Sequence, residues 1–419
     1  MLKYNLSLAE MFGVMGRGAP RLGVVVVRCQ VSVGRSLASS ATLQGRMPTS
    51  PVEEVKERKE RKEMGVVDLY RRLNTWPSQA ALTSHLLDNI VYHDPAADKH
   101  GLVLLNKPHG LPLQPVGDSA YSLASSLKDL AEMLQVKELR VVKAAERWNS
   151  GLTVLGTAEG TAERYRRCLK AMQGERLFPT SYLCLTKGHS SLAKTETVSL
   201  RLVDCPQVAN PVVGKVHREP EISRKLVSRH QATREGSRTV HLHCSTVANS
   251  SRAAAALVEV QPSSTGKAVL QVYLADLGHA VLGDTMYDYR ARTVMGHRVK
   301  LTTSHTLAER TQVLPAAMLE VLGLARGEEW EVPRMVHLHR LHLAHWLGKD
   351  THLTVFAPLP PYLALTCRQL GIQTDTSQLA ERDQLRTWNK SKFNAKKKEK
   401  KQQRLQQSQQ TIDSGPMPS

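Results

Sequence analysis

This sequence of 419 residues lacks several features that identify secreted, zinc-binding or membrane proteins. Its six cysteines are scattered and none forms a C-x-x-C pair, so we expect neither a disulfide framework nor a zinc ribbon. This cysteine usage favours a reducing compartment. No apolar run is long enough to cross a bilayer, so no membrane span is expected, and no internal repeat is apparent.

Acidic residues are scarce at the start of the chain. Residues 1–48 contain six Lys or Arg residues and one glutamate, together with several serines. This composition is typical of a mitochondrial presequence, so we expect residues 1–48 to direct the protein to the mitochondrial matrix. A secretory signal is the alternative, but the repeated arginines interrupt its apolar region.

Positive charge is also concentrated near the other end. The formal net charge is +19, and residues 390–405 hold eight basic side chains against one glutamate. The body stays basic when both ends are set aside. A basic body suits a polyanionic partner such as nucleic acid, although a mildly basic globule without such a partner fits the charge as well.

The order of the predicted elements indicates the fold class. Apolar runs such as LTVLG and SYLCLT predict strands, whereas residues 121–134 and 161–172 have apolar side chains at helical spacing. Strands outnumber helices and do not alternate regularly with them. This order predicts an α+β fold with a largely antiparallel sheet.

Composition divides the rest of the chain into four segments. Residues 49–87 are expected to form a charged, partly helical linker, and residues 88–365 a folded domain with a polar insertion at about 290–332. A helical extension over 366–390 and a basic, Gln-rich disordered tail over 391–419 follow.

Four segments, in order, resemble RNA pseudouridine synthases of the RluA type: GLVLLNKPHGLPL, SYLCLTKG, LADLGHAVLGDTMY and HLHRLHLAH with the following FAPLPPYL. The third is close to the family pattern L-A-x-x-G-H-P-I-x-G-D-x-x-Y. The resemblance implies the pseudouridine synthase fold, with a mixed, mainly antiparallel central sheet, flanking helices and a central RNA-binding cleft. It also implies that a uridine is flipped out of RNA and that its base is detached and rejoined through carbon, without cofactor or metal.

The catalytic loop of this family reads H-R-L-D-x-x-T-S-G. Its Ser-Gly aligns with Ser150-Gly151 without a gap, which puts Glu146 at the position of the catalytic aspartate. No aspartate occurs between Asp129 and Asp204, so no other register restores one. The longer side chain displaces the carboxylate by roughly 1 Å, a misplacement that costs about 10²-fold in rate, yet glutamate is a competent nucleophile elsewhere.

A second departure lies at the partner of this carboxylate. The family arginine that pairs with the aspartate falls on Gln271, so we expect Lys143 or Arg147 to be the nearest substitute cation. Tyr182 matches the family tyrosine that packs against the flipped base. The resemblance therefore predicts Glu146 and Tyr182 as catalytic residues of an altered centre.

Basic side chains near the loop and in the segment 215–238 are the candidates for contacting RNA phosphates. They are Lys143, Arg147, Arg224, Lys225 and Arg229. The alternative is that the segment 215–238 is a solvent-exposed part of the chain that does not contact RNA.

The histidines of HLHRLHLAH invite a zinc site. In a strand His337 and His339 share one face and His342 does not, so we expect no metal there and no cofactor elsewhere.

Two functional hypotheses remain open from the sequence. The first is an isomerase that converts uridine to pseudouridine in mitochondrial rRNA or mRNA. The second is a noncatalytic RNA-binding factor in mitochondrial RNA metabolism or ribosome assembly, with RNA-granule or ribosome-assembly proteins as partners. The retained carboxylate and tyrosine favour the first, and the lost aspartate and arginine favour the second.

Overall fold

The computed structural model describes residues 23–28, 65–94, 101–117, 121–205, 217–225, 229–294, 297–300, 312–348 and 351–374. Side chains at 23–28, 205, 217, 229 and 291–300 are not described. Most of the expected presequence, the first part of the expected linker and the expected basic tail therefore lie outside the described residues. No helix in the described ranges has the length and hydropathy needed to cross a membrane.

The strands are β1 (Gly23–Arg28), β2 (Ile90–His93), β3 (Leu102–Lys107), β4 (Arg140–Lys143), β5 (Ser150–Gly156), β6 (Thr180–Lys187), β7 (Ala193–Cys205), β8 (His217–Ser223), β9 (Arg238–Asn249), β10 (Ala255–Pro262), β11 (Ala291–Val294), β12 (His297–Lys300), β13 (Val336–Gly348) and β14 (Thr351–Phe356). The helices are α2 (Val66–Arg71), α3 (Gln79–Asp88), α4 (Leu123–Met133), α5 (Thr161–Gly174), α6 (Arg229–Arg234), α7 (Val269–Asp276), α8 (Ala316–Leu322) and α9 (Pro361–Gln369), with 3-10 turns η3 (Asp288–Arg290) and η4 (Glu329–Glu331).

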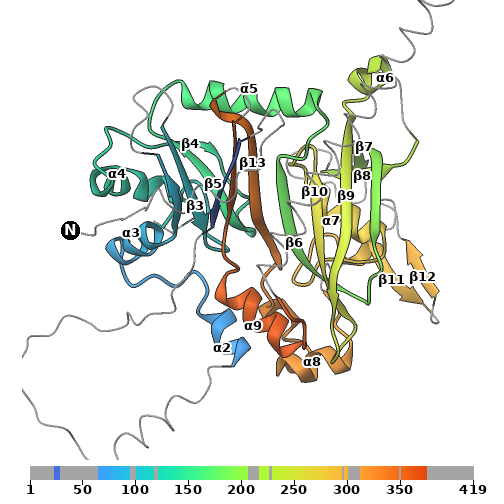
Figure 1. Cartoon of the computed structure of the whole chain (residues 1–419). Coiled ribbons are helices and arrows are strands. Elements are labelled where there is room, and N and C mark those ends of the chain that lie inside the picture. The colour runs from blue at the N-terminus through green and yellow to red at the C-terminus, as the bar shows by residue number, and fades with distance from the viewer. Residues whose placement is uncertain are drawn as a thin grey trace, which may run out of the picture. The chain divides into compact units, whose positions relative to one another are not determined.

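Twelve strands form one sheet, whose central path is β2-β3-β5-β13-β6-β10-β9-β7-β8. All pairs along this path are antiparallel except β5 with β13, which run parallel. β13, near the end of the folded chain, is therefore inserted between two strands from its first half (Figure 1). The predicted α+β class with a mixed, mainly antiparallel sheet is confirmed.

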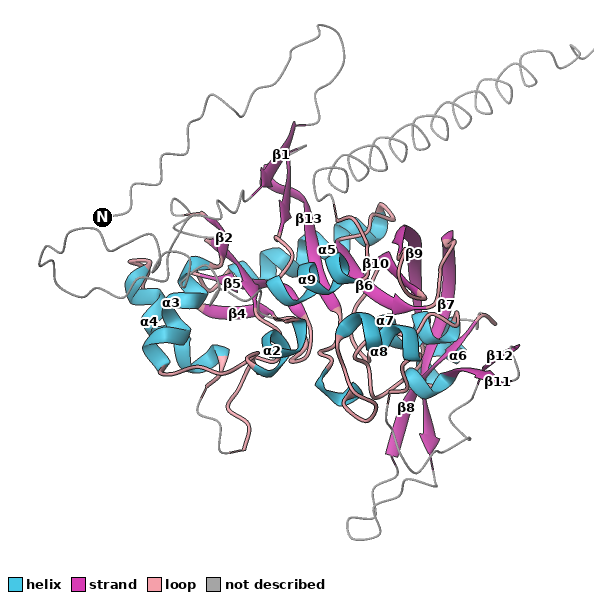
Figure 2. Cartoon of the chain, turned by 90° about the horizontal axis from the view of Figure 1, so that it is seen from below, coloured by secondary structure: helices cyan, strands magenta, loops and turns pink. Residues whose placement is uncertain are grey.

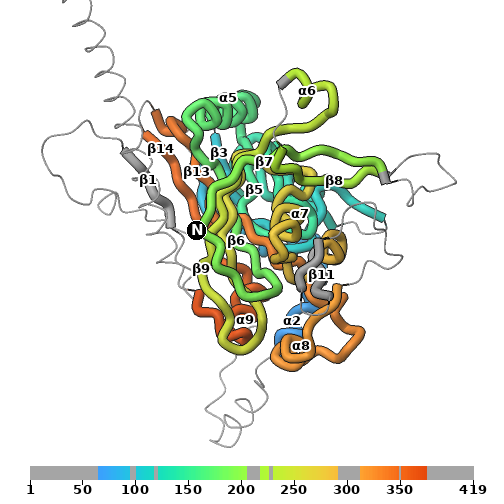
Figure 3. Tube along the Cα trace, turned by 90° about the vertical axis from the view of Figure 1, so that its right-hand side faces the viewer, coloured from blue at the N-terminus to red at the C-terminus, as the bar shows by residue number. Residues whose placement is uncertain are grey.

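Helices cover the sheet in separate groups. α3 and α4 pack together beside β3, and Figure 2 shows them at the opposite end of the sheet from β7, β8 and α6. α5 packs across β13. Figure 3 shows the paired strands β7 and β9 running side by side. α4 begins with a capping box in which Ser122 and Ser125 bond reciprocally, and its apolar face includes the fully buried Leu123 and Leu130.

The folded body is longer at both ends than the expected 88–365. Leu82 and Leu86 of α3 lie four residues apart and are fully buried against β3 and β5, so this part of the expected linker belongs to the core. At the other end α9 continues past residue 365, and Thr366 and Cys367 are fully buried. Within the expected presequence, β1 pairs parallel to β14.

Candidate active site

The loop that carries Glu146 is anchored at the junction between β5 and β13. The Ser150 hydroxyl lies 3.0 Å from His337 Nδ1 and 3.0 Å from the Tyr362 hydroxyl. Gly151 has φ +112°, and a Cβ there would lie 2.4 Å from the carbonyl oxygen of Leu338. The Ser-Gly pair is therefore needed because a parallel strand passes close to the backbone at this point.

Glu146 lies at the end of this loop with its side chain 43% exposed. Its Oε2 is 3.4 Å from Gln271 Nε2 and 3.5 Å from Asn149 Nδ2. Gln271 is buried in the first turn of α7. The structure thus brings together the two positions that the motif alignment paired, although an amide replaces the cation.

Arg334, which the sequence analysis missed, is a cation close to Glu146. Its Nη1 lies 3.8 Å from Glu146 Oε2, and its Nη2 lies 3.5 Å from Asp284 Oδ1. The arginine is 12% exposed and Asp284 is 1% exposed. Burial raises the pKa of Asp284, and Arg334 opposes this rise.

The Gly-Asp part of the third family-like segment explains how Arg334 reaches this place. Gly283 has φ +80°, and a Cβ there would lie 2.0 Å from the carbonyl oxygen of Pro333. The backbone of residues 333–334 therefore packs directly against Gly283. This contact positions Arg334 near Asp284 and Glu146. The pairing involves segments distant in sequence, so no local pattern signals it.

Tyr182 lies on β6 opposite Leu338 and Val260 and is 6% exposed. Burial raises the pKa of its hydroxyl, Glu146 raises it further, and a hydrogen bond with Thr265 opposes the rise. The phenol therefore stays protonated at neutral pH. Tyr182 lies in the same part of the molecule as Ala145, the residue before Glu146.

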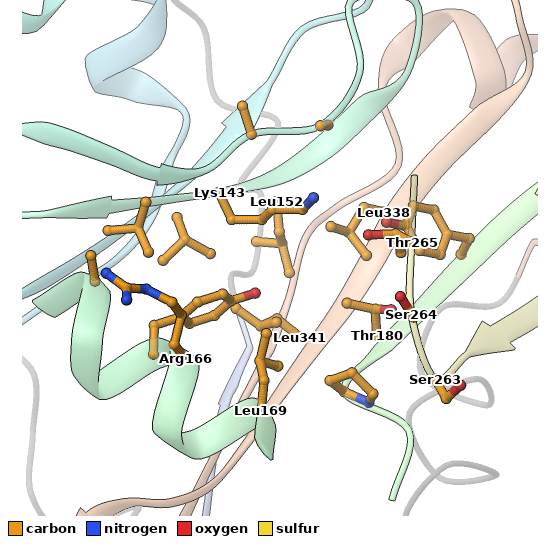
Figure 4. Close-up of a pocket in the computed structure, with 18 of the residues that line it drawn as sticks. Lys143, Leu152, Arg166, Leu169, Thr180, Ser263, Ser264, Thr265, Leu338 and Leu341 are labelled. Atoms are coloured by element: carbon orange, nitrogen blue, oxygen red, sulfur yellow. The ribbon is translucent and has the colours of Figure 1, made fainter. Parts of the chain in front are cut away.

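A cavity of about 320 Å³ adjoins this region, and Tyr182 and Ala145 form part of its wall. Its other lining residues include Leu152, Leu169, Leu338 and Leu341 as apolar wall, Thr180, Ser263, Ser264 and Thr265 as hydroxyl donors, and Lys143 and Arg166 as cations (Figure 4). A mainly apolar cavity with a few hydroxyls is suited to a planar, partly polar ring. A nucleobase has this character.

Lys107 is hydrogen-bonded to the loop that carries Glu146. Its ammonium donates to the carbonyl oxygens of Pro108 (2.9 Å), Leu111 (3.1 Å) and Arg147 (3.2 Å), and the side chain is 1% exposed. Burial, with a smaller effect of Arg147, lowers its pKa to about 7. The lysine thus ties the NKP segment to the residue that follows Glu146.

The two predicted RNA contacts in the loop have different surroundings. Lys143 is exposed at the cavity wall. Arg147 contacts Trp148 and Gly110: its Cζ lies 4.4 Å from the centroid of the Trp148 ring, and its Nε donates to the carbonyl oxygen of Gly110 at 3.2 Å.

The three predicted contacts in the basic segment lie apart from the cavity lining. Arg224 pairs with Glu196 and Asp276, each at 2.6 Å, so its charge is balanced within the protein. Lys225 is exposed. Arg229 begins α6, and its side chain lies outside the described residues.

The histidines of β13 make contacts within the core. His339 Nδ1 lies 2.8 Å from the carbonyl oxygen of Ala357, and His342 Nδ1 lies 2.7 Å from the Thr354 hydroxyl. Burial lowers the pKa of His337 to about 3 and that of His339 to about 4, so both are neutral at physiological pH. The described residues contain no cluster of three or more potential metal ligands.

Comparison with known proteins decides the family. The human mitochondrial mRNA pseudouridine synthase RPUSD3 is 32% identical over 282 residues, which cover 66% of this chain and 76% of that protein. The chain belongs to the RNA pseudouridine synthase family. The Bos taurus RPUSD3 protein is likewise 32% identical over 279 residues, covering 65% of the chain and 76% of the relative. The resemblance predicted from the four segments is confirmed.

More distant members of the RNA pseudouridine synthase family are also similar to the chain. The Danio rerio mitochondrial pseudouridylate synthase RPUSD4 is 24% identical over 296 residues, covering 67% of the chain and 74% of that protein. The structure of human RNA pseudouridylate synthase domain containing 4 shares the fold with a TM-score of 0.50 at 20% identity, covering 71% of this chain and 98% of that one. No protein-family model matches the chain.

Proposed function

We propose that this protein is an isomerase that converts uridine to pseudouridine in mitochondrial RNA. The observation that carries the proposal is a carboxylate, Glu146, at the family's aspartate position, next in sequence to Ala145, which lines a cavity suited to a base together with the buried Tyr182. The names of the relatives, which include mitochondrial mRNA pseudouridine synthases, support RNA as substrate and the mitochondrion as compartment. We place the protein in the matrix because the basic, acid-poor residues 1–48 are typical of a matrix-directed presequence.

In this reaction the C1′–N1 bond of the flipped uridine breaks and a C1′–C5 bond forms. C5 loses its proton and N1 gains one, so the product is an isomer and no further reactant is needed. Glu146 is the carboxylate that acts on the nucleoside, as nucleophile or as base. Tyr182 packs against the base, and its protonated hydroxyl is available for hydrogen bonding at the reacting ring.

Arg334 supplies the positive charge that Gln271 lacks. Its guanidinium lies 3.8 Å from Glu146 Oε2, so it attracts the carboxylate electrostatically. Arg334 approaches Glu146 from the side of Asp284, so one cation serves two carboxylates. This arrangement supports catalysis despite the missing family arginine.

The second candidate is a noncatalytic RNA-binding factor in mitochondrial RNA metabolism or ribosome assembly. The contacts of Glu146 favour it, because they are long, at 3.4 to 3.8 Å, and the side chain is 43% exposed. A catalytic carboxylate is usually held by shorter contacts, although such contacts often tighten only when substrate binds.

The two candidates are separated by mapping pseudouridine in mitochondrial RNA from cells that lack the protein. The cells are rescued with the natural protein, with Glu146→Gln or with Glu146→Asp. We expect at least one pseudouridine to disappear in the deficient cells, to return with the natural protein and to stay absent with Glu146→Gln. The aspartate variant keeps the charge and restores the family residue, so we expect it to recover part of the modification.

The same variants test the second candidate by RNA binding. A noncatalytic factor binds RNA equally well as the natural protein and as Glu146→Gln, with affinity that falls steeply with salt. Full rescue of every pseudouridine by Glu146→Gln contradicts the catalytic proposal and leaves the binding role.

A further inference from the structure

Trp148 is an exposed aromatic side chain two residues after Glu146. It is 43% exposed, and among the described residues the other exposed tryptophan is Trp330, which is 70% exposed in η4. Indole rings of this size are usually buried because they contribute much apolar area. An exposed one beside a candidate catalytic carboxylate therefore points to a ligand.

The ring is held in place although it is exposed. The Arg147 guanidinium lies over the ring with Cζ 4.4 Å from its centroid, and the His109 ring centroid lies 5.8 Å away at 45°. His109 is itself buried and packs against Tyr362 with ring centroids 5.5 Å apart. One contact on the ring thus comes from the exposed Arg147 side chain and the other from a buried ring of the core.

The backbone before Trp148 is also fixed. The Arg147 carbonyl oxygen accepts hydrogen bonds from Gly110 N at 2.8 Å and from Lys107 Nζ at 3.2 Å. The Arg147 side chain returns a bond to the Gly110 carbonyl oxygen. A side chain fixed before binding loses little conformational entropy on binding, which increases affinity.

The surroundings identify the kind of ligand. Arg147 puts positive charge over the ring, and Lys143 puts a second cation at the wall of the adjoining cavity; both side chains are exposed. An exposed aromatic ring next to basic side chains is the arrangement on which unpaired nucleotides bind, with the base stacked on the ring and the phosphate near the cations. Stacking requires a free base face, which a paired base inside a duplex does not offer.

We propose that Trp148 is a stacking platform for an unpaired RNA base that neighbours the uridine entering the site. This proposal rests on the proposed function for its RNA substrate, but it requires only binding and no reaction. It makes single-stranded or looped RNA the preferred class over continuous duplex. It also predicts tolerance of base identity at the stacked position, because every base has an aromatic face.

The test compares Trp148→Ala, Trp148→Phe and Trp330→Ala in the full chain. The probes are a synthetic hairpin RNA with uridine in its loop and a fully paired duplex of the same composition. We expect Trp148→Ala to weaken hairpin binding between about fivefold and about a hundredfold. Trp148→Phe should keep most of the affinity, and Trp330→Ala should match the natural protein.

Salt dependence and duplex binding distinguish a lost stacking contact from a lost ionic contact, and a folding measurement excludes misfolding. The salt dependence of hairpin binding should keep its slope in Trp148→Ala, because the lost contact is not ionic. Duplex binding should stay unchanged, and far-UV circular dichroism with urea unfolding shows whether the variant is folded. Unchanged hairpin affinity in folded Trp148→Ala, or an equal loss for hairpin and duplex, overturns the proposal.

The outcome is independent of the catalytic proposal. If Glu146→Gln still restores pseudouridine while Trp148→Ala loses hairpin affinity, catalysis by Glu146 is wrong and the stacking platform stands. If Trp148→Ala leaves RNA binding intact but disrupts association with a protein, the ring is a protein contact and the RNA proposal fails.

Discussion

Two neighbouring stretches, the loop 144–149 and the strand β5 that follows it, are built in different ways. Every residue of β5 is buried, and Ser150 makes two contacts of 3.0 Å to the core. In the loop, Glu146 and Trp148 are exposed, and the polar contacts of the Glu146 side chain are 3.4 Å or longer. The strand determines where the loop lies, and we propose that the loop presents side chains that contact RNA, so substitutions should separate stability from function.

The largest effect on stability is expected at the first glycine of β5. Gly151→Ala forces a side chain into a positive-φ position 2.4 Å from the Leu338 carbonyl oxygen, which should cost more than about 3 kcal/mol of unfolding free energy. Urea unfolding measures it. Gly174→Ala at the end of α5 is the control, because nothing lies within 4 Å of its Cβ, and it should be neutral or stabilising by up to about 1 kcal/mol. Equal effects of the two variants would contradict the close approach of the Leu338 backbone to Gly151.

Arg334→Met tests the residue that connects the loop, through Glu146, to the buried Asp284. It leaves the buried Asp284 without its cation, and we expect a loss of about 3 kcal/mol at neutral pH. Because burial already raises the pKa of Asp284, the loss should shrink as the pH falls and the carboxyl becomes protonated. Adding Asp284→Asn should recover part of the stability but none of the pseudouridine formation. Recovery of both would show that Arg334 acts on Asp284 alone.

The buried histidines of β13 should make the core sensitive to acid. His337 and His339 have pKa values of about 3 and about 4 in the folded protein, below the ordinary 6.5. Between pH 6.5 and 4 the unfolded chain binds protons that the folded chain does not, so stability falls as pH is lowered, by up to about 1.4 kcal/mol per unit for each histidine.

The variant His339→Asn should be less stable at neutral pH, because a buried ring is lost, but should show a shallower decline towards about pH 5. His230→Asn, at an exposed position on α6, should keep the natural decline. Urea unfolding across this pH range gives the comparison. An unchanged slope in His339→Asn contradicts the assignment.

The smallest effect on stability is expected at Lys143, the last residue of β4, directly before the loop. Lys143→Ala removes an exposed side chain and should change the unfolding free energy by less than about 0.5 kcal/mol. RNA affinity should fall for all sequences, and the salt slope should decrease by about 1 if the lysine meets one phosphate. Lys128→Ala, exposed on α4, should change neither quantity. A large stability loss in Lys143→Ala would place the loop within the structural core.

Much of this fold was predictable because its signals are local. The helical spacing of apolar residues predicted α4 and α5, and the apolar runs LTVLG and SYLCLT predicted β5 and β6. The motif alignment put Glu146 and Gln271 at positions that pair in the family, and the two side chains are in contact in the structure. α3 was hidden beside a charged segment, although Ser78 accepts a hydrogen bond from Ala81 N as an N-cap and could have signalled it.

The role of Arg334 and the exposure of Trp148 could not be predicted from the sequence. Arg334 depends on the close contact of Gly283 with Pro333, which joins two separate segments. The position of the Trp148 ring depends on His109, which comes from the loop after β3. Such features appear only when distant parts of the chain pack together.

The position of β13 has a consequence for how the protein is made. β5 and β6 are synthesised early, yet they do not pair with each other, because β13 occupies the place between them. A nascent chain that ends before residue 334 lacks both Arg334 and the strand that unites Glu146, beside β5, with Tyr182 on β6. The centre therefore assembles only after most of the folded domain has left the ribosome, and a message truncated before β13 encodes two partial sheets and no site.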